Sequence, residues 1–210
     1  YEHKYLKDNN FIKAGTKDKI FKLFERGKFL KDFIPTLKFK GEYFFSYEYL
    51  EGKTLYQLND INIYKKYLEW FGNNFCKINI KEKDESAYKF YFGKTKSRLE
   101  LAKSNIYFQD LDSKKMINDK QVLTIDEYIN KIDWEELSNI ISTELFHGDL
   151  QFDNILYNGY EFKFIDWRED FGGNTNFGDL YYDLAKMYGG MILNYLEMKN
   201  PKNYEHMITG

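Results

Sequence analysis

Residues 145–166 of the chain read LFHGDLQFDNILYNGYEFKFID. Two short apolar runs, 155–157 and 162–165, flank the dipeptide Asn158-Gly159. Because Asn and Gly both accept the positive φ of a tight turn, this pattern predicts an antiparallel hairpin. The open end of such a hairpin brings the residues on its two sides together, although they are distant in sequence.

Three polar side chains flank the predicted hairpin. Asn154 precedes its first strand, Asp166 follows its second strand, and Asp149 lies in the loop just before. Two carboxylates and one amide oxygen would then surround a common point, with no thiolate among them. Hard oxygen ligands of this kind suit Mg²⁺ rather than Zn²⁺. The segment therefore predicts a magnesium site, while Asp153 is expected to be an exposed loop carboxylate.

The order His147-x-Asp149, Asn154, short hairpin, Asp166 resembles the catalytic core of the protein-kinase-like fold. More narrowly, it resembles the aminoglycoside phosphotransferase and choline kinase group of small-molecule kinases. The resemblance implies an α+β, two-lobed fold with a short β-rich N-lobe and a mainly helical C-lobe. It also implies that Asp149 is the base that accepts the substrate hydroxyl proton, and that Asn154 and Asp166 hold the Mg²⁺ ions on the phosphates of ATP. His147 has a structural role in this family.

Several residues depart from the protein kinases themselves. Gly148 stands where protein kinases usually carry an arginine, and Trp167 with Arg168 replaces Phe-Gly after the metal-binding aspartate. Only 16 residues separate Asp166 from Asp183, with no proline among them, so we expect no control by activation-loop phosphorylation. Asp183 lies in a segment that resembles one of the small-molecule kinases, where the aspartate supports the catalytic loop.

Charged residues directly after the metal-binding aspartate are candidates for the acceptor site. Arg168, Glu169 and Asp170 are expected to face the substrate cleft, so that one of them contacts the acceptor. A simple cluster of surface charges is the alternative interpretation, and the sequence leaves both open.

The first third of the chain is rich in strand patterns. An apolar run over 10–15 predicts a strand, and helical spacing of apolar residues from Thr16 up to Pro35 predicts a helix. Two aromatic-rich runs, 36–40 and 43–50, predict an antiparallel hairpin around Gly41.

The family resemblance assigns nucleotide contacts to this region. Lys13 and Glu25 match the lysine and glutamate that pair to hold the α- and β-phosphates, against the simpler interpretation of a surface lysine and an ordinary helix glutamate. The segment 47–52 resembles the hinge between lobes, with Glu48, Tyr49 and Leu50 at the adenine. Residues 1–12 contain no glycine-rich phosphate loop. Either the first strands lie outside this chain, or phosphate contacts depend on Lys13 and magnesium.

The remainder of the chain reads as mainly helical. Apolar residues recur at helical intervals over 54–77 and 126–143, whereas 80–120 is charged and weakly periodic, with a helix expected around 96–104. We therefore expect an N-lobe over 1–51 and a C-lobe over 52–210. The chain is short for this fold at both ends, which indicates a fragment, a module of a longer protein, or a reduced member of the family.

Composition excludes several classes of protein. Lys+Arg 31 against Asp+Glu 33 gives a net charge of -2, which argues against nucleic acid as a partner. The aromatic content of 20% excludes a disordered chain. Cys76 is the single cysteine, and no apolar stretch approaches the roughly 20 residues of a membrane span. We expect a soluble protein in a reducing cytoplasm, with no membrane partner.

The resemblance implies an ATP-dependent phosphotransferase that acts on a hydroxyl group of a small molecule. A sugar or cell-surface metabolite is the first expectation for the acceptor, choline or ethanolamine the second, and an aminoglycoside the third, because a polycation pocket should be more acidic than 126–183. The helical region 54–146 and the residues after Asp166 are expected to build the acceptor pocket. A catalytically inactive kinase-fold module that binds a nucleotide or metabolite is the alternative.

Overall fold

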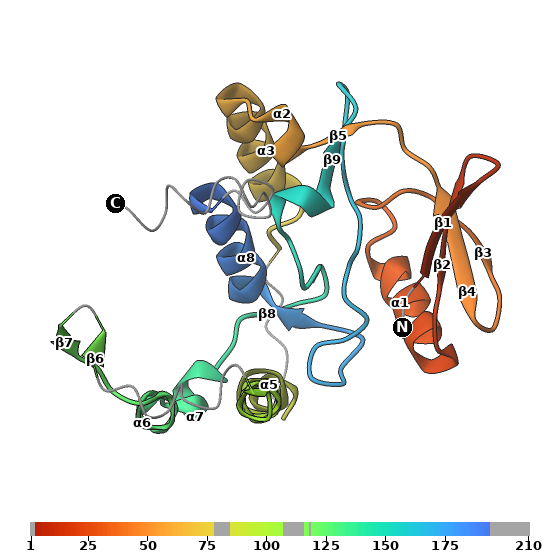
Figure 1. Cartoon of the computed structure of the whole chain (residues 1–210). Coiled ribbons are helices and arrows are strands. Elements are labelled where there is room, and N and C mark those ends of the chain that lie inside the picture. Colours follow the sequence, from red (N-terminus) through yellow and green to blue (C-terminus); the bar gives the residue numbers. More distant parts are fainter. Residues whose placement is uncertain (1–2, 78–84, 107–115, 118, 194–210) are drawn as a thin grey trace. The chain divides into compact units, whose positions relative to one another are not determined.

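The structure, a computed structural model, describes residues 3–77, 85–106, 116–117 and 119–193 (Figure 1). Contacts divide the chain into two compact units, the first made of Tyr1–Lys81 with Ile141–Gly210 and the second of Glu82–Ile140. The N-terminal strands and the 145–166 segment therefore belong to one unit. The lobe boundary at residue 51 falls inside this unit and stays a prediction.

A four-stranded antiparallel sheet forms the N-terminal part of the first unit. The sheet has the order β1-β2-β4-β3. Its strands are β1 (His3–Lys7), β2 (Asn10–Ala14), β3 (Leu37–Lys40) and β4 (Phe44–Glu48). The predicted strand and hairpin are confirmed, but β1 was not predicted. Asp8 and Asn9 form the tight turn between β1 and β2, both with positive φ.

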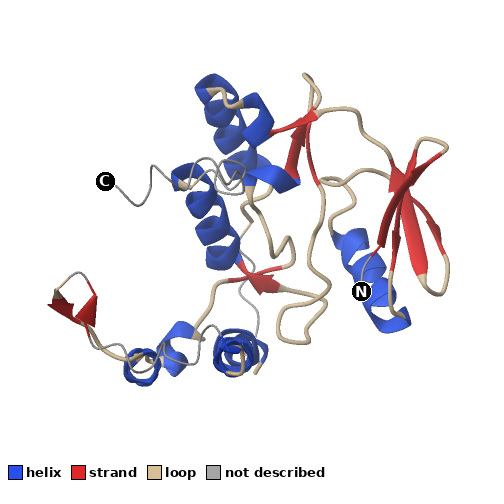
Figure 2. Cartoon of the chain, viewed as in Figure 1, coloured by secondary structure: helices blue, strands red, loops and turns tan. Residues whose placement is uncertain are grey.

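Helix α1 (Lys17–Phe29) follows β2 and contacts β4 (Figure 2). Ile20 and Leu23 are buried on its inner face. The prediction that helical spacing extends to Pro35 was wrong beyond Phe29, because Leu30 leaves the helix and its amide donates to the Gly27 carbonyl instead. Leu30 is still fully buried, which is why the apolar pattern continued past the helix.

The hairpin predicted around Asn158-Gly159 is confirmed. Strands β9 (Ile155–Tyr157) and β10 (Phe162–Phe164) pair antiparallel, with Phe162 opposite Tyr157 and Phe164 opposite Ile155. The short strand β5 (Lys53–Thr54) extends this sheet on the β9 side. The amide of Phe164 also donates to the carbonyl of Phe33 at 2.7 Å, which joins the hairpin to the segment after α1.

Helices complete the first unit. They are α2 (Leu55–Leu58), α3 (Ile61–Asn74) and α8 (Leu180–Ile192), with a 3₁₀ turn at Phe152–Asn154 and a small pairing of β8 (Ser142–Thr143) with β11 (Gly178–Asp179). The helical pattern predicted over 54–77 is interrupted between α2 and α3. Asn59 adopts the left-handed conformation that ends α2, and the Asp60 carboxylate caps α3 by accepting from the amides of Asn62 and Ile63.

The second unit is largely helical in its described residues. It contains α4 (Ser86–Tyr88), a π-helical turn (Lys89–Gly93), α5 (Lys94–Lys103), α6 (Ile125–Lys131) and α7 (Trp134–Leu137), with β6 (Met116–Ile117) paired to β7 (Lys120–Gln121). The helix predicted around 96–104 is confirmed. The pattern over 126–143 splits because Asp133 caps a new helix, accepting from the amide of Glu136 at 2.9 Å. Parts of the weakly periodic region, 78–84, 107–115 and 118, lie outside the described residues.

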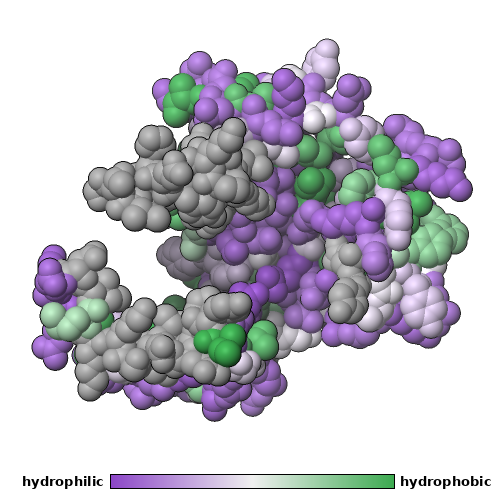
Figure 3. Space-filling model, in the orientation of Figure 1, coloured by the Kyte–Doolittle hydropathy of each residue, from purple (hydrophilic) through white to green (hydrophobic). Residues whose placement is uncertain are grey.

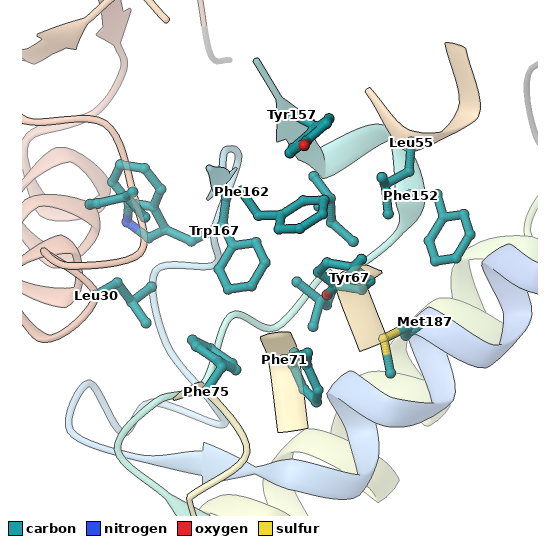
Figure 4. Close-up of a cluster of buried hydrophobic side chains, with 14 of the residues drawn as sticks. Leu30, Leu55, Tyr67, Phe71, Phe75, Phe152, Tyr157, Phe162, Trp167 and Met187 are labelled. Atoms are coloured by element: carbon teal, nitrogen blue, oxygen red, sulfur yellow. The ribbon is translucent and has the colours of Figure 1, made fainter. Parts of the chain in front are cut away.

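The core of the first unit is built mainly from aromatic side chains (Figure 4). Phe164 packs edge-on against Phe75 at a centroid distance of 4.8 Å, and Tyr157 stacks on Phe162 at 4.6 Å. In Figure 3 the coloured part of the visible surface is mostly hydrophilic, with smaller hydrophobic patches in green. A large part of the aromatic content therefore fills this core, while other aromatic side chains, such as those of Tyr160 and Tyr188, are exposed. Within the described residues, none of the helices combines the length and apolar character needed to cross a bilayer.

Candidate active site

The loop of residues 147–151, which we call the Asp149 loop, is held by the buried side chain of His147. The ring Nε2 lies 2.9 Å from the carbonyl of Ile165 and its Nδ1 lies 3.2 Å from the amide of Asp149. These partners define the tautomer, with Nε2–H donating and Nδ1 accepting. Complete burial lowers the pKa of His147 to about 4. The imidazole is thus neutral at ordinary pH and ties the loop to the end of β10.

The carboxylate of Asp183, on α8, also holds the Asp149 loop. Its two carboxylate oxygens accept from the amides of His147 and Gly148, each at 2.7 Å. Burial raises the pKa of Asp183 to about 7, although both amides and the charge of Arg26 favour its ionised form. Gly148 has a φ of +84°, and a Cβ added there would lie 2.6 Å from the Cβ of Arg168. This close approach explains why glycine, rather than arginine, stands at position 148.

Asp149 lies at the surface of the loop and is half-buried. Its Oδ1 accepts from Lys186 on α8 at 2.9 Å and from the side-chain amide of Gln151 at 3.0 Å. Burial alone would raise the pKa of Asp149, but Lys186 and Gln151 outweigh burial and hold the pKa below its usual value. Asp149 is therefore an ionised acceptor at neutral pH.

Asn154 lies just before β9 and is buried. Its Nδ2 donates to the backbone carbonyl of Asp149 at 2.7 Å, which sets the orientation of the side-chain amide. Since the nitrogen is used in this bond, Oδ1 is the atom of Asn154 that can act as a hard ligand. The amide of Ile165 donates to the Asn154 carbonyl at 3.0 Å, so the two ends of the hairpin are joined directly.

Asp166 follows β10 in a left-handed conformation, with a φ of 58°. The next residue, Trp167, is buried and its indole nitrogen donates to the Leu23 carbonyl on α1 at 2.8 Å. The Nζ of Lys13 lies 2.5 Å from Asp166 Oδ1, and the Nζ of Lys4 lies 2.7 Å from Oδ2. Burial alone would raise the pKa of Asp166, but the two ammonium groups outweigh it and keep the pKa below its usual value.

The three residues predicted to form the site face one pocket of about 370 Å³. The lining of this polar pocket consists of Lys4, Lys13, Lys19, Leu23, Asp149, Gln151, Asp153, Asn154, Asp166, Trp167, Arg168 and Glu169. The structure thus brings Asp149, Asn154 and Asp166 together, as the hairpin geometry predicts. Lys13 joins them from β2.

The oxygen ligands in the polar pocket fit Mg²⁺ better than a metal that is coordinated by protein side chains alone. Among the described residues no three His, Cys, Asp or Glu side chains cluster as a metal site. Mg²⁺ is commonly held by one or two carboxylates together with substrate phosphates, which Asp166 and the Asn154 amide could match. Asp153, expected to be exposed, is instead half-buried, and its Oδ1 is buried without a hydrogen-bond partner among the described residues. An unsatisfied carboxylate oxygen of this kind favours a cation nearby.

The predicted pair of Lys13 and Glu25 is not formed. Glu25 pairs with Lys28 one turn along α1, at 2.7 Å, while the ammonium group of Lys13 reaches Asp166. The helix phase explains the difference, because Glu25 follows Leu23 by two residues and therefore lies away from the face that carries Lys19 and Leu23 to the pocket. Lys13 itself is only 2% exposed, so it is not a surface lysine.

A second, apolar pocket of about 160 Å³ lies at the segment predicted to be a hinge. It is lined by Phe11, Pro35, Tyr47, Tyr49, Leu50, Gly52, Leu156, Ile165 and Asp166. Asp166 lines both pockets, so the apolar pocket adjoins the polar one. The amides of Glu48 and Tyr49 donate to the carbonyls of Thr36 and Asn9. Of the three predicted adenine contacts, Tyr49 and Leu50 line this pocket, whereas Glu48 lies at the end of β4 beside Lys38.

The charged residues after Asp166 occupy different places. Arg168 and Glu169 line the polar pocket, and the Nε of Arg168 donates to the Gly148 carbonyl at 3.3 Å. Asp170 lies 3.5 Å from Lys22 on α1 and accepts from the amide of Gly173. Asp170 therefore contributes to a local turn and an ion pair.

Arg26 is a site-supporting residue that the sequence analysis did not identify. It is buried, and its guanidinium donates to four backbone carbonyls, those of Glu144, Phe146, Thr175 and Asn176. Burial lowers the pKa of Arg26 to about 10, so it remains charged. The sequence held only a modest signal for this role. Arg26 is one of three arginines in a lysine-rich chain, and arginine is the cation suited to buried contacts with several acceptors.

Lys4 and Lys186 were also missed, because both bind carboxylates far away in the sequence. Lys186 follows Asp183 by three residues on α8, so one face of this helix carries both contacts to the Asp149 loop. That spacing is visible in the sequence, although it identifies the partner only once Asp149 is placed.

Comparisons with known proteins give a distant structural likeness. No family model matches the chain, and no curated protein matches it. Among solved structures, the chain is similar to a choline kinase from Cryptosporidium parvum Iowa II, at 13% identity and a TM-score of 0.44. The similarity covers 90% of this chain, and the chain spans 62% of the length of that choline kinase.

Proposed function

We propose that the chain is an ATP-dependent phosphotransferase that transfers the γ-phosphate to a hydroxyl group of a small molecule. One observation carries the proposal: Asp149, Asn154 and Asp166 line the same polar pocket, which shares Asp166 with the apolar pocket. A buried cation, Lys13, lines the polar pocket and pairs with Asp166. An apolar pocket, a cation, a pair of hard metal ligands and a carboxylate that can accept a proton are the groups that phosphoryl transfer requires. In this chain that carboxylate is Asp149, which is ion-paired with Lys186.

The proposed chemistry depends mainly on positioning. Mg·ATP, when bound, supplies the phosphoryl group and neutralises its charge. Asp166 and Asn154 would hold the metal, and Lys13 would contact phosphate oxygens. Asp149 would orient the acceptor hydroxyl and accept its proton, which its ionised state at neutral pH allows. His147 and Asp183 hold the loop that presents Asp149 and take no part in proton transfer.

The acceptor and the setting of the protein are also proposals. A sugar or polyol is our first choice, then an amino alcohol such as choline, then an aminoglycoside. Arg168 and Glu169 are the charged residues proposed to contact the acceptor, because both line the polar pocket. We propose a cytoplasmic protein with no nucleic-acid or membrane partner, which acts alone or as a module of a longer chain.

The test is a coupled assay of ADP release over sugars, amino alcohols and aminoglycosides. Asp149→Asn should reduce turnover with the best acceptor by at least about a hundredfold, while Mg·ADP affinity stays within about twofold. Asp60→Asn, an exposed helix cap that Asn fills equally well, is the matched control and should keep full activity. Wild-type turnover in the Asp149→Asn variant would refute the role of Asp149.

A second candidate is a kinase-fold module that binds a nucleotide without transferring its phosphate. The ion pairs of Lys4 and Lys13 with Asp166 favour it, because they satisfy this carboxylate without a metal. In that case Mg·ADP would bind, but no acceptor in the screen would release ADP faster than water.

A further inference from the structure

The carboxylate of Asp166 faces two lysines that lie directly opposite each other on neighbouring strands. In the register of β1 and β2, Lys4 pairs with Lys13. Side chains that are directly opposite in an antiparallel pair share one face, and like charges in such a pair repel. Here Asp166 relieves the repulsion by pairing one oxygen with each ammonium group. One negative charge is thus shared by two positive charges.

The two lysines differ in exposure. The side chain of Lys13 is 2% exposed and paired with Asp166, whereas the side chain of Lys4 is 43% exposed. A solvent-facing ion pair such as Lys4 with Asp166 is weak and easily exchanged. Lys4 can therefore leave Asp166 without leaving an uncompensated buried charge behind.

A better partner for Lys4 would be present in the proposed complex. A divalent cation at Asp166 competes with both ammonium groups for the same two oxygens. Phosphate oxygens beside that cation are strong acceptors for lysine. Lys4 lines the polar pocket together with Lys13 and Lys19, so its ammonium group already lies where such oxygens would be.

We propose that Lys4 is a nucleotide-binding residue that exchanges Asp166 for the β- or γ-phosphate of a nucleoside di- or triphosphate. The inference rests on the proposed function. The turn before β2 is Asp8-Asn9 and contains no glycine. In this proposal the ammonium group of Lys4, on β1, makes the phosphate contact that the backbone of a glycine-rich turn would otherwise make.

The test is calorimetric titration of the full chain with ADP, AMP and adenosine in the presence of Mg²⁺. Lys4→Gln should weaken ADP binding by about tenfold or more, the loss expected for one charged hydrogen bond, and leave adenosine affinity within about twofold. Lys4→Arg should retain most of the ADP affinity. Lys7→Gln is the matched control, because Lys7 lies on the same strand but on the opposite face, and it should bind all three ligands as wild type does.

The outcomes separate this inference from the proposed function. If wild type binds ADP and Lys4→Gln binds it equally well, the role of Lys4 is refuted and the phosphotransferase proposal survives. If Lys4→Gln binds Mg·ADP more tightly than wild type, Lys4 only shields Asp166 from the metal, and the inference is also overturned. If wild type binds neither ADP nor adenosine, both proposals fail. Thermal midpoints of the variants verify that the sheet is intact.

Discussion

Replacing Arg26 with Met should destabilise the protein strongly, because one buried guanidinium connects α1 to the segment just before the Asp149 loop and to the segment just before β11. Its Nη2 donates to the carbonyls of Glu144 and Phe146 at 2.5 and 2.6 Å, and its Nη1 donates to Asn176 at 3.2 Å. Each short charged bond contributes about 1.5–3 kcal/mol. The relief of no longer burying a cation offsets part of this loss, and breaking a buried charge network costs about 3–5 kcal/mol overall.

We therefore expect Arg26→Met to lower the free energy of unfolding by about 4 kcal/mol, or the melting temperature by about 8–16 °C in a chain of this size. Urea unfolding followed by tryptophan fluorescence measures the loss by linear extrapolation, since Trp167 is buried against α1. Arg98→Met is the control: Arg98 is exposed on α5, and its loss should change stability by less than about 0.5 kcal/mol. A loss below about 1 kcal/mol for Arg26→Met would refute the structural role given to this residue.

Two further substitutions test the Asp149 loop. Lys186→Met removes an ammonium group that helps to outweigh the burial of Asp149, so the pKa of Asp149 should rise. The acidic limb of the pH profile of kcat/KM should then move to higher pH, whereas Lys186→Arg should leave this limb in place. An unmoved acidic limb in Lys186→Met would contradict the effect of Lys186 on Asp149. Gly148→Ala places a Cβ 2.6 Å from that of Arg168 at a φ of +84° and should cost about 2 kcal/mol or more in urea unfolding, whereas a stability equal to wild type would show that the loop adopts another conformation.

The sequence was most informative where the signal was local. The β9–β10 hairpin followed from Asn158-Gly159, whose backbone preferences select a tight turn, and this hairpin brings Asn154 to Asp166. Strand β1 was missed because all five of its residues are exposed and show no alternation of apolar and polar side chains. The break between α2 and α3 depends on the left-handed conformation of Asn59, which an apolar pattern does not reveal.

Contacts between distant residues could not be predicted in the same way. Arg26 binds a carbonyl 120 positions away, and Lys4 binds a carboxylate 162 positions away. Such pairs depend on strand register and helix phase, which a single sequence leaves open. The Lys13–Glu25 pair failed for this reason: Lys13 faces the site as expected, but the phase of α1 directs Glu25 to Lys28.

The central claim is that Asp166 and its neighbours bind a nucleotide through a metal, and isothermal titration of ADP with and without Mg²⁺ tests it most directly. For the wild-type chain, Mg²⁺ should tighten ADP binding by about tenfold or more. Asp166→Ala should lose this gain while still binding metal-free ADP, because Lys4, Lys13 and the apolar pocket remain. Equal wild-type affinities with and without Mg²⁺, or a full Mg²⁺ effect in Asp166→Ala, would contradict the account.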